Sequence, residues 1–74
     1  MIDIKKEFQT HNFRLRYIDH RYLGTNHIGI SYAFLHEGKL YNGVIIYKIV
    51  EGKIDWSGRA EMFDSWNDIN QKER

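Results

Sequence analysis

The segment from Leu40 to Val50 constrains the fold more than any other part of the chain. It is rich in β-branched and aromatic residues, and the same tripeptide, Glu-Gly-Lys, flanks it at residues 37–39 and 51–53. Residues of this kind favour strands, and a glycine-containing pair between two apolar runs is typical of a hairpin turn. The sequence therefore predicts a central strand over residues 40–50 with a β-hairpin at each end.

Two-residue turns at the Glu-Gly pairs would determine which residues face one another in both hairpins. In the first hairpin the expected pairs are Phe34–Tyr41, Tyr32–Gly43, Ile30–Ile45 and Ile28–Tyr47. In the second they are Val50–Lys53, Ile49–Ile54, Lys48–Asp55, Tyr47–Trp56, Ile45–Gly58 and Tyr41–Met62. Because side chains alternate between the two faces of a strand, both registers place their large apolar residues on one common face. A turn with a bulged residue is the competing geometry, because Glu-Gly is a poorer two-residue turn than Asn-Gly.

The remaining elements follow from shorter patterns. Asp3 is a suitable N-cap for a helix over residues 4–10, and the alternation of residues 13–17 predicts a first strand with Phe13 facing the core. Alternation from Ile54 to Met62 predicts a fourth strand, and a closing helix over residues 65–72 would bury Trp66 and Ile69. The expected fold is α+β: a four-stranded antiparallel β-meander with short N- and C-terminal helices packed on one face.

Composition sets broad limits on what this chain does. Its 74 residues make one domain, 1–74, and a 42% hydrophobic and 15% aromatic content predicts a folded globule. A net charge of +1 argues against a generally nucleic-acid-binding or membrane-binding surface. The absence of cysteine excludes disulfides and fits a reducing compartment. The polar start and the absence of an apolar run of about 20 residues favour a cytoplasmic protein without a membrane segment.

No pattern in the sequence predicts catalysis, a metal site or a cofactor. The four histidines show no paired ligand spacing, and no cysteine could complete a tetrahedral zinc site. Asp19 and His20 are sequence neighbours, whose side chains usually point apart, and no serine lies in a nucleophile-elbow context. The glycine-containing segment 24–29 leads into a strand, whereas a phosphate cradle leads into a helix. We therefore expect a non-enzymatic protein.

The sheet face away from the helices gives the clearest functional hypothesis. The central strand is apolar on both faces, whereas a solitary antiparallel sheet normally has a polar outer face. A protein partner, a second copy of the chain or a flap of the chain's own termini could cover it, although isolated exposed apolar residues are also common. An apolar centre with an arginine rim is typical of protein interfaces. The residues expected to bind a partner are Arg14, Arg16, Leu35, Leu40, Val44, Ile46 and Arg59.

Nucleic acid is the rival partner, because an open sheet carrying arginines and aromatics can stack bases. That hypothesis is weaker while the aromatics are assigned to the helix-covered face. In its size, its lack of cysteine and its sheet-plus-helix pattern, the chain resembles small phage-encoded inhibitors of host enzymes or of CRISPR effectors. This resemblance covers no motif and transfers no residue, but it implies a module that binds and blocks another protein.

Overall fold

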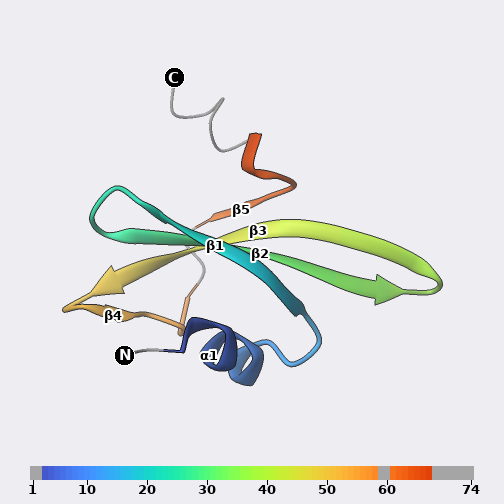
Figure 1. Cartoon of the computed structure of the whole chain (residues 1–74), viewed down its shortest axis with the longest axis horizontal. Helices are drawn as coiled ribbons and strands as arrows, with labels where there is room; N and C mark the ends of the chain where they lie inside the picture. Colours follow the sequence, from blue (N-terminus) through green and yellow to red (C-terminus); the bar gives the residue numbers. More distant parts are fainter. Residues whose placement is uncertain (1–2, 59–60, 68–74) are drawn as a thin grey trace.

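An antiparallel meander with one helix makes up the structure, a computed structural model that describes residues 3–58 and 61–67 (Figure 1). The elements are α1 (Ile4–His11), β1 (Arg16–Leu23), β2 (His27–His36), β3 (Lys39–Val50), β4 (Lys53–Ile54) and β5 (Glu61–Phe63). The strands lie in the order β1-β2-β3-β4, every neighbouring pair is antiparallel, and β5 also pairs with β3. The predicted α+β class and the β-meander are confirmed.

Both hairpins turn at their Glu-Gly pairs, as predicted. Glu37 and Gly38 have φ angles of 50° and 78°, and Glu51 and Gly52 have φ angles of 52° and 78°. Positive φ at both central residues defines the type I′ turn, whose twist matches that of the flanking strands. All four predicted pairs of the first hairpin are present in the register of β2 and β3. The bulged-turn alternative is therefore excluded for this hairpin.

The second hairpin follows the prediction only at its start. Ile49 faces Ile54 and Val50 faces Lys53, and the Asp55 N–H donates to the Lys48 carbonyl at 2.9 Å. The chain then leaves β3 and returns with Met62 opposite Ile45, although the sequence predicted Met62 opposite Tyr41. The single strand predicted over residues 54–62 is wrong, because the pairing of β5 with β3 is shifted by four residues from the register that β4 begins. An even number keeps the alternation in phase, so Met62 still shares the face of Ile45.

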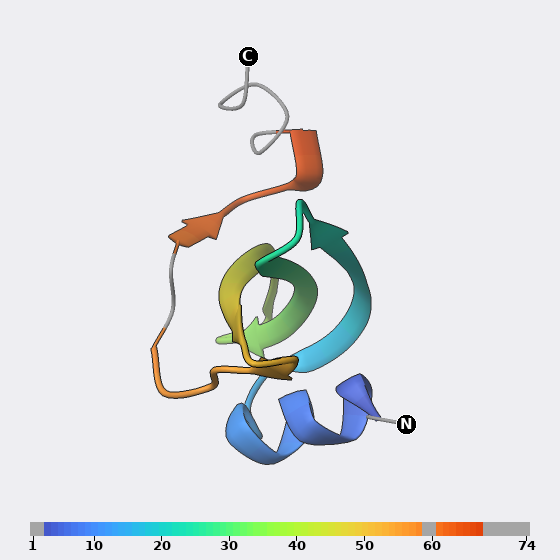
Figure 2. The ribbon, with the colours of Figure 1, turned by 90° about the vertical axis from the view of Figure 1, so that its left-hand side faces the viewer.

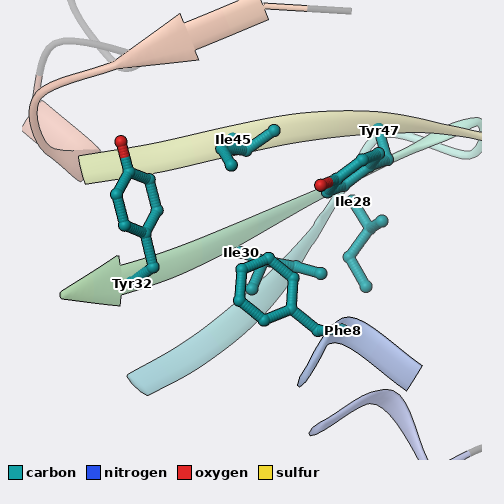
Figure 3. Packing of buried hydrophobic residues seen from close by; sticks show 6 residues of the cluster. All are labelled: Phe8, Ile28, Ile30, Tyr32, Ile45 and Tyr47. Carbon is teal, nitrogen blue, oxygen red and sulfur yellow. The ribbon is translucent and has the colours of Figure 1, made fainter. Parts of the chain in front are cut away.

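Helix α1 covers one face of the sheet and supplies the centre of the main core. The Asp3 carboxylate caps the helix by accepting the Lys6 N–H at 3.0 Å. The fully buried Phe8 points from α1 toward the sheet (Figure 3). Around it lie Ile28, Ile30, Tyr32, Ile45 and Tyr47. The predicted helix is confirmed, and its apolar side packs against the face chosen by the hairpin register.

The first strand begins later than the sequence predicted. β1 starts at Arg16, while residues 13–15 form the connection from α1, and Phe13 is 79% exposed where a core position was expected. The side chain of Gln9 holds this connection, because its amide donates to the Leu15 carbonyl and its oxygen accepts the Tyr17 N–H. These hydrogen bonds satisfy backbone groups that a strand partner would otherwise satisfy.

A second, smaller core lies on the opposite face of the sheet. Val44 and Ile46 are buried there, with Leu23, Phe63 and Trp66 packed against them. We call residues 61–67 the strap: β5 pairs with the edge of β3, and the residues that follow it bring Trp66 over that face (Figure 2). Trp66 therefore lies on the side away from α1, and the prediction that both ends of the chain pack on one face is wrong. The remainder of the predicted closing helix, including Ile69, falls outside the described residues.

Candidate functional site

The end of the β2–β3 hairpin projects beyond the other strands and is the candidate site. Pairing of β1 with β2 stops at Ala33, which faces Arg16, and pairing of β5 with β3 stops at Val44. Residues 34–43, which we call the arm, therefore form a ribbon of two strands (Figure 1). An isolated two-stranded ribbon is only marginally stable in water, so the type I′ turn and its cross-strand pairs must hold the arm in shape.

The face of the arm away from α1 exposes two leucines. Leu35 and Leu40 lie directly opposite each other, and they are 71% and 67% exposed. Arg16 faces Ala33 at the base of the arm, two residues along β2 from Leu35. The leucine pair is thus a small apolar patch with an arginine near its base.

The other face of the arm carries a stack of aromatic rings. The rings of Phe34 and Tyr41 lie 5.1 Å apart at an interplanar angle of 18°, and Tyr32 stacks on Phe34 at 6.3 Å and 26°. The Tyr32 hydroxyl lies over Gly43, the residue that Tyr32 faces, and a side chain there would occupy the same space. The stack stiffens the arm, because Phe34 packs against its cross-strand partner Tyr41 and against Tyr32, two residues away on the same face of β2.

A cleft of about 420 Å³ lies beside this aromatic stack. It lies where α1 ends at His11: Tyr32, at the edge of the core around Phe8, is still buried, whereas Phe34 is only partly buried. The volume falls within the range typical of ligand pockets, about 300–1,000 Å³. Its lining is His11, Asn12, Phe13, Arg14, Leu15, Tyr32, Phe34 and Met62.

The charge of the cleft is positive. Arg14 is exposed at its rim, with its guanidinium carbon 5.7 Å from the centroid of the Phe13 ring. His11 stacks on Trp56 at 5.2 Å, and the described lining contains no aspartate or glutamate. An apolar group with a carboxylate beside it would suit both the walls and the rim of such a cleft.

The residues predicted to bind a partner are separated by the structure into three groups. Leu35, Leu40 and Arg16 share the outer face, whereas Arg14 lines the cleft on the helix side. Val44 and Ile46 are only 1% and 8% exposed, because the strap covers them. The expectation that these two residues lie on an open surface is wrong, and a flap of the chain itself is the cover. Arg59 lies outside the described residues.

Sequence reasoning missed the cleft because it assigned Phe13 and Phe34, together with the buried Tyr32, to a helix-covered core, whereas Phe13 is exposed and Phe34 is only partly buried. The signal that could have found it is the length of α1: eight residues span about 12 Å, whereas ten residues of strand span about 33 Å. One short helix cannot cover a sheet of that length.

The described residues contain no cluster of three or more histidine, cysteine or acidic side chains that could hold a metal ion. None of the helices in the described ranges is long and apolar enough to span a membrane. Comparisons of the chain with models of known protein families, with curated proteins and with solved structures find no match.

Proposed function

We propose that this chain is a small non-enzymatic interaction module that binds another protein through the arm. The observation that carries the proposal is the exposed Leu35–Leu40 pair at the projecting end of a hairpin. Burial of a leucine side chain contributes about 1.5–3 kcal/mol, so two neighbouring leucines are a substantial part of a weak interface. Single exposed apolar residues need no explanation, but a cross-strand pair on a projecting ribbon is placed to enter a partner's groove.

The finer proposal is that binding blocks the partner, as in the small phage-encoded inhibitors that the chain resembles, and that it takes place in the cytoplasm. A narrow ribbon with apolar side chains on both faces can occupy a concave site of a larger protein. Tyr41, with the aromatic stack behind it, would contact one wall of such a site while Leu40 contacts the other. The arm is stiffened before binding, which reduces the ordering entropy that association costs.

Nucleic acid is the second candidate, because Phe34 and Tyr41 of the aromatic stack are not fully buried and Arg14 lines the cleft beside them. However, the faces of Tyr32, Phe34 and Tyr41 are turned toward one another. Proteins that stack bases present an open ring face to each base, and here much of that surface is already used within the arm. The protein partner is therefore favoured.

Site-specific photocrosslinking tests the proposal. A photoreactive residue in place of Leu35 should give covalent adducts with another protein in the cells that naturally make this chain. Leu40→Glu should abolish these adducts, because it places a charge in the apolar contact. The same residue at Ile18, an exposed apolar position on β1, is the matched control and should give no adduct. Equal labelling from both positions, or adducts that nuclease removes and that weaken steeply with salt, would contradict protein docking by the arm.

A further inference from the structure

Among residues 3–58 and 61–67, no strand pairs with the outer edge of the arm. In a two-residue hairpin the residues next to the turn, here His36 and Lys39, form a hydrogen-bonded pair, and the pairs then alternate. The backbone groups of Leu40 and Asn42 consequently point away from β2. The same alternation is seen farther along, where the Lys48 carbonyl accepts the Asp55 N–H on the outer side. Within the described residues, β5 covers this edge only at residues 44–46.

The edge of β1 and the edge of β3 along the arm differ in how they are protected against strand addition. β1 contains a register irregularity between Tyr17 and Asp19, and the Asp19 carboxylate accepts the His20 N–H at 2.8 Å. Irregularities and charges of this kind prevent another strand from adding to an edge. The β3 edge over residues 39–43 has no proline, no irregularity in its pairing and a charge only at Lys39. The β1 edge is therefore protected against strand addition, whereas the β3 edge over residues 39–43, which we call the open edge, is not.

The open edge adjoins the cleft. Met62, which lines the cleft, lies on β5 just beyond the end of the open edge, opposite Ile45. Tyr32, which also lines it, reaches over Gly43. A strand added beside residues 39–43 would point alternate side chains to the helix side, toward the cleft, and the others toward Leu40. One extended segment can therefore pair with the backbone of residues 39–43 and also place a side chain in the cleft.

We propose that an extended segment of a partner protein adds to β3 beside residues 39–43. One bulky apolar side chain of this segment enters the cleft, and a neighbouring carboxylate meets Arg14. The strap shows that the edge accepts such a sequence, because Glu61, Met62 and Phe63 are already paired to it antiparallel at residues 44–46. This is β-strand addition, in which main-chain hydrogen bonds supply affinity and side-chain pockets supply specificity. The inference rests on the proposed protein-binding function and names the kind of partner.

A second copy of the chain fits the same edge less well. Antiparallel pairing of two arms satisfies the outward groups of both copies only with Leu40 opposite Asn42. That register brings the turn of one copy, at Gly38, opposite Val44 of the other, where Phe63 already lies. A partner segment without a turn at that point avoids the collision.

Peptide titration followed by amide NMR tests the proposal. The probe is the peptide acetyl-Asp-Phe-Val-Phe-Asp-amide, added to the ¹⁵N-labelled full chain. Saturable shifts at Leu40, Asn42 and Phe34, with slower amide exchange at Leu40 and Asn42, are expected. Replacing both aspartates by lysines, or N-methylating alternate peptide amides, should weaken binding by at least about tenfold, the effect of one hydrogen bond or ion pair worth about 1.4 kcal/mol.

Substitutions in the chain give the matched controls. Asn42→Pro removes the outward N–H and should weaken the peptide about tenfold, whereas Asn42→Ala keeps the N–H and should leave affinity within about twofold. Arg14→Glu should lose the preference for aspartate over lysine peptides, and Arg14→Lys should keep it. If Asn42→Pro fails to fold, the N-methylated peptide still tests whether main-chain hydrogen bonds hold the peptide on β3.

Four results would overturn the inference. The first is the absence of a saturable shift at about 5 mM peptide, the weakest binding that such a titration resolves. The second is equal binding of the lysine peptide, and the third is preferential binding of a single-stranded oligonucleotide. The fourth is a shift at residues 39–43 that depends on the concentration of the chain without any peptide. Leu35 photoadducts together with any of these results would leave protein docking standing and reject only strand addition.

Discussion

Two glycines allow aromatic rings to lie directly on the sheet. The nearest ring atom of Trp66 would be 2.8 Å from a Cβ at Gly29, and the Tyr32 hydroxyl would be 2.5 Å from a Cβ at Gly43. Contacts this short require the ring to move. At Gly29 the ring also interacts with Arg21, whose guanidinium lies 4.6 Å from its centroid. Glycine is therefore required at both positions, because any side chain there would occupy the space of the ring.

Gly29→Ala should displace Trp66 and loosen the strap. We expect a loss of about 1–3 kcal/mol in the free energy of unfolding, the usual cost of overpacking. In a Trp56→Phe background, the fluorescence of Trp66 should also move to longer wavelength. Gly58→Ala is the control, since nothing lies within 4 Å of a Cβ there. An unchanged emission spectrum in Gly29→Ala would show that the ring does not depend on this contact.

The pKa of Asp55 is lowered by the hydrogen bonds that its carboxylate accepts from the Ser57 hydroxyl and the Ser57 N–H, with a smaller contribution from Lys48. A lowered pKa in the folded state means that the ionised carboxylate favours folding above its ordinary pKa of about 3.9. This contribution disappears as the pH falls through the folded-state pKa. Ser57→Ala should raise the pKa of Asp55, measured by NMR titration of the carboxyl carbon, and Ser65→Ala should not.

At the scale of the element, the two hairpin turns are the most local determinants of the fold. Both require a left-handed backbone at a glutamate, for which such a conformation is unfavourable by about 1–2 kcal/mol. Asparagine tolerates this region better, and Asn-Gly is the preferred type I′ pair. The chain therefore carries some avoidable strain at Glu37 and Glu51.

Glu37→Asn should raise the free energy of unfolding by about 0.5–1 kcal/mol, because asparagine adopts positive φ more easily. Gly38→Ala should lower it by about 1 kcal/mol, because alanine at φ 78° is strained although the space is open. Urea unfolding measures both changes. A gain from Gly38→Ala would contradict the type I′ geometry. Docking by the arm should survive Glu37→Asn.

At the scale of the whole molecule, one sheet separates two cores of unequal size. α1 closes the larger core, and a strap of seven residues closes the smaller one. The buried residues Val44 and Ile46 belong to the fold, while Leu35 and Leu40, on the same face, remain available. The strap thus limits the candidate docking surface on this face to the arm.

Val44→Glu should destabilise the protein by several kcal/mol, since it places a charge in a site that is 1% exposed. Leu40→Glu should change the free energy of unfolding by less than about 0.5 kcal/mol, as usual for an exposed position, and should abolish docking. Thermal and urea unfolding of the two variants make the comparison. A folded, stable Val44→Glu variant would mean that the strap does not cover this residue.

The sequence by itself determined the features that depend on a few neighbouring residues. The Glu-Gly pairs specify the turns, each turn specifies which residues face one another, and alternation then assigns faces. Asp3 similarly specifies the start of α1. Leu35 and Leu40 could be recognised as surface candidates from this reasoning, because it needs only the register of one hairpin.

Only the tertiary structure decided how far α1 and the strap extend across the two faces of the sheet. The alternation of residues 54–62 is the same for a continuous strand and for one interrupted by four residues, since four is an even number. No local pattern says on which side Trp66 packs, or that α1 stops short of Phe34. Those outcomes depend on competition between distant surfaces for the same sheet face. They decide that Val44 is core and that a cleft remains beside Arg14.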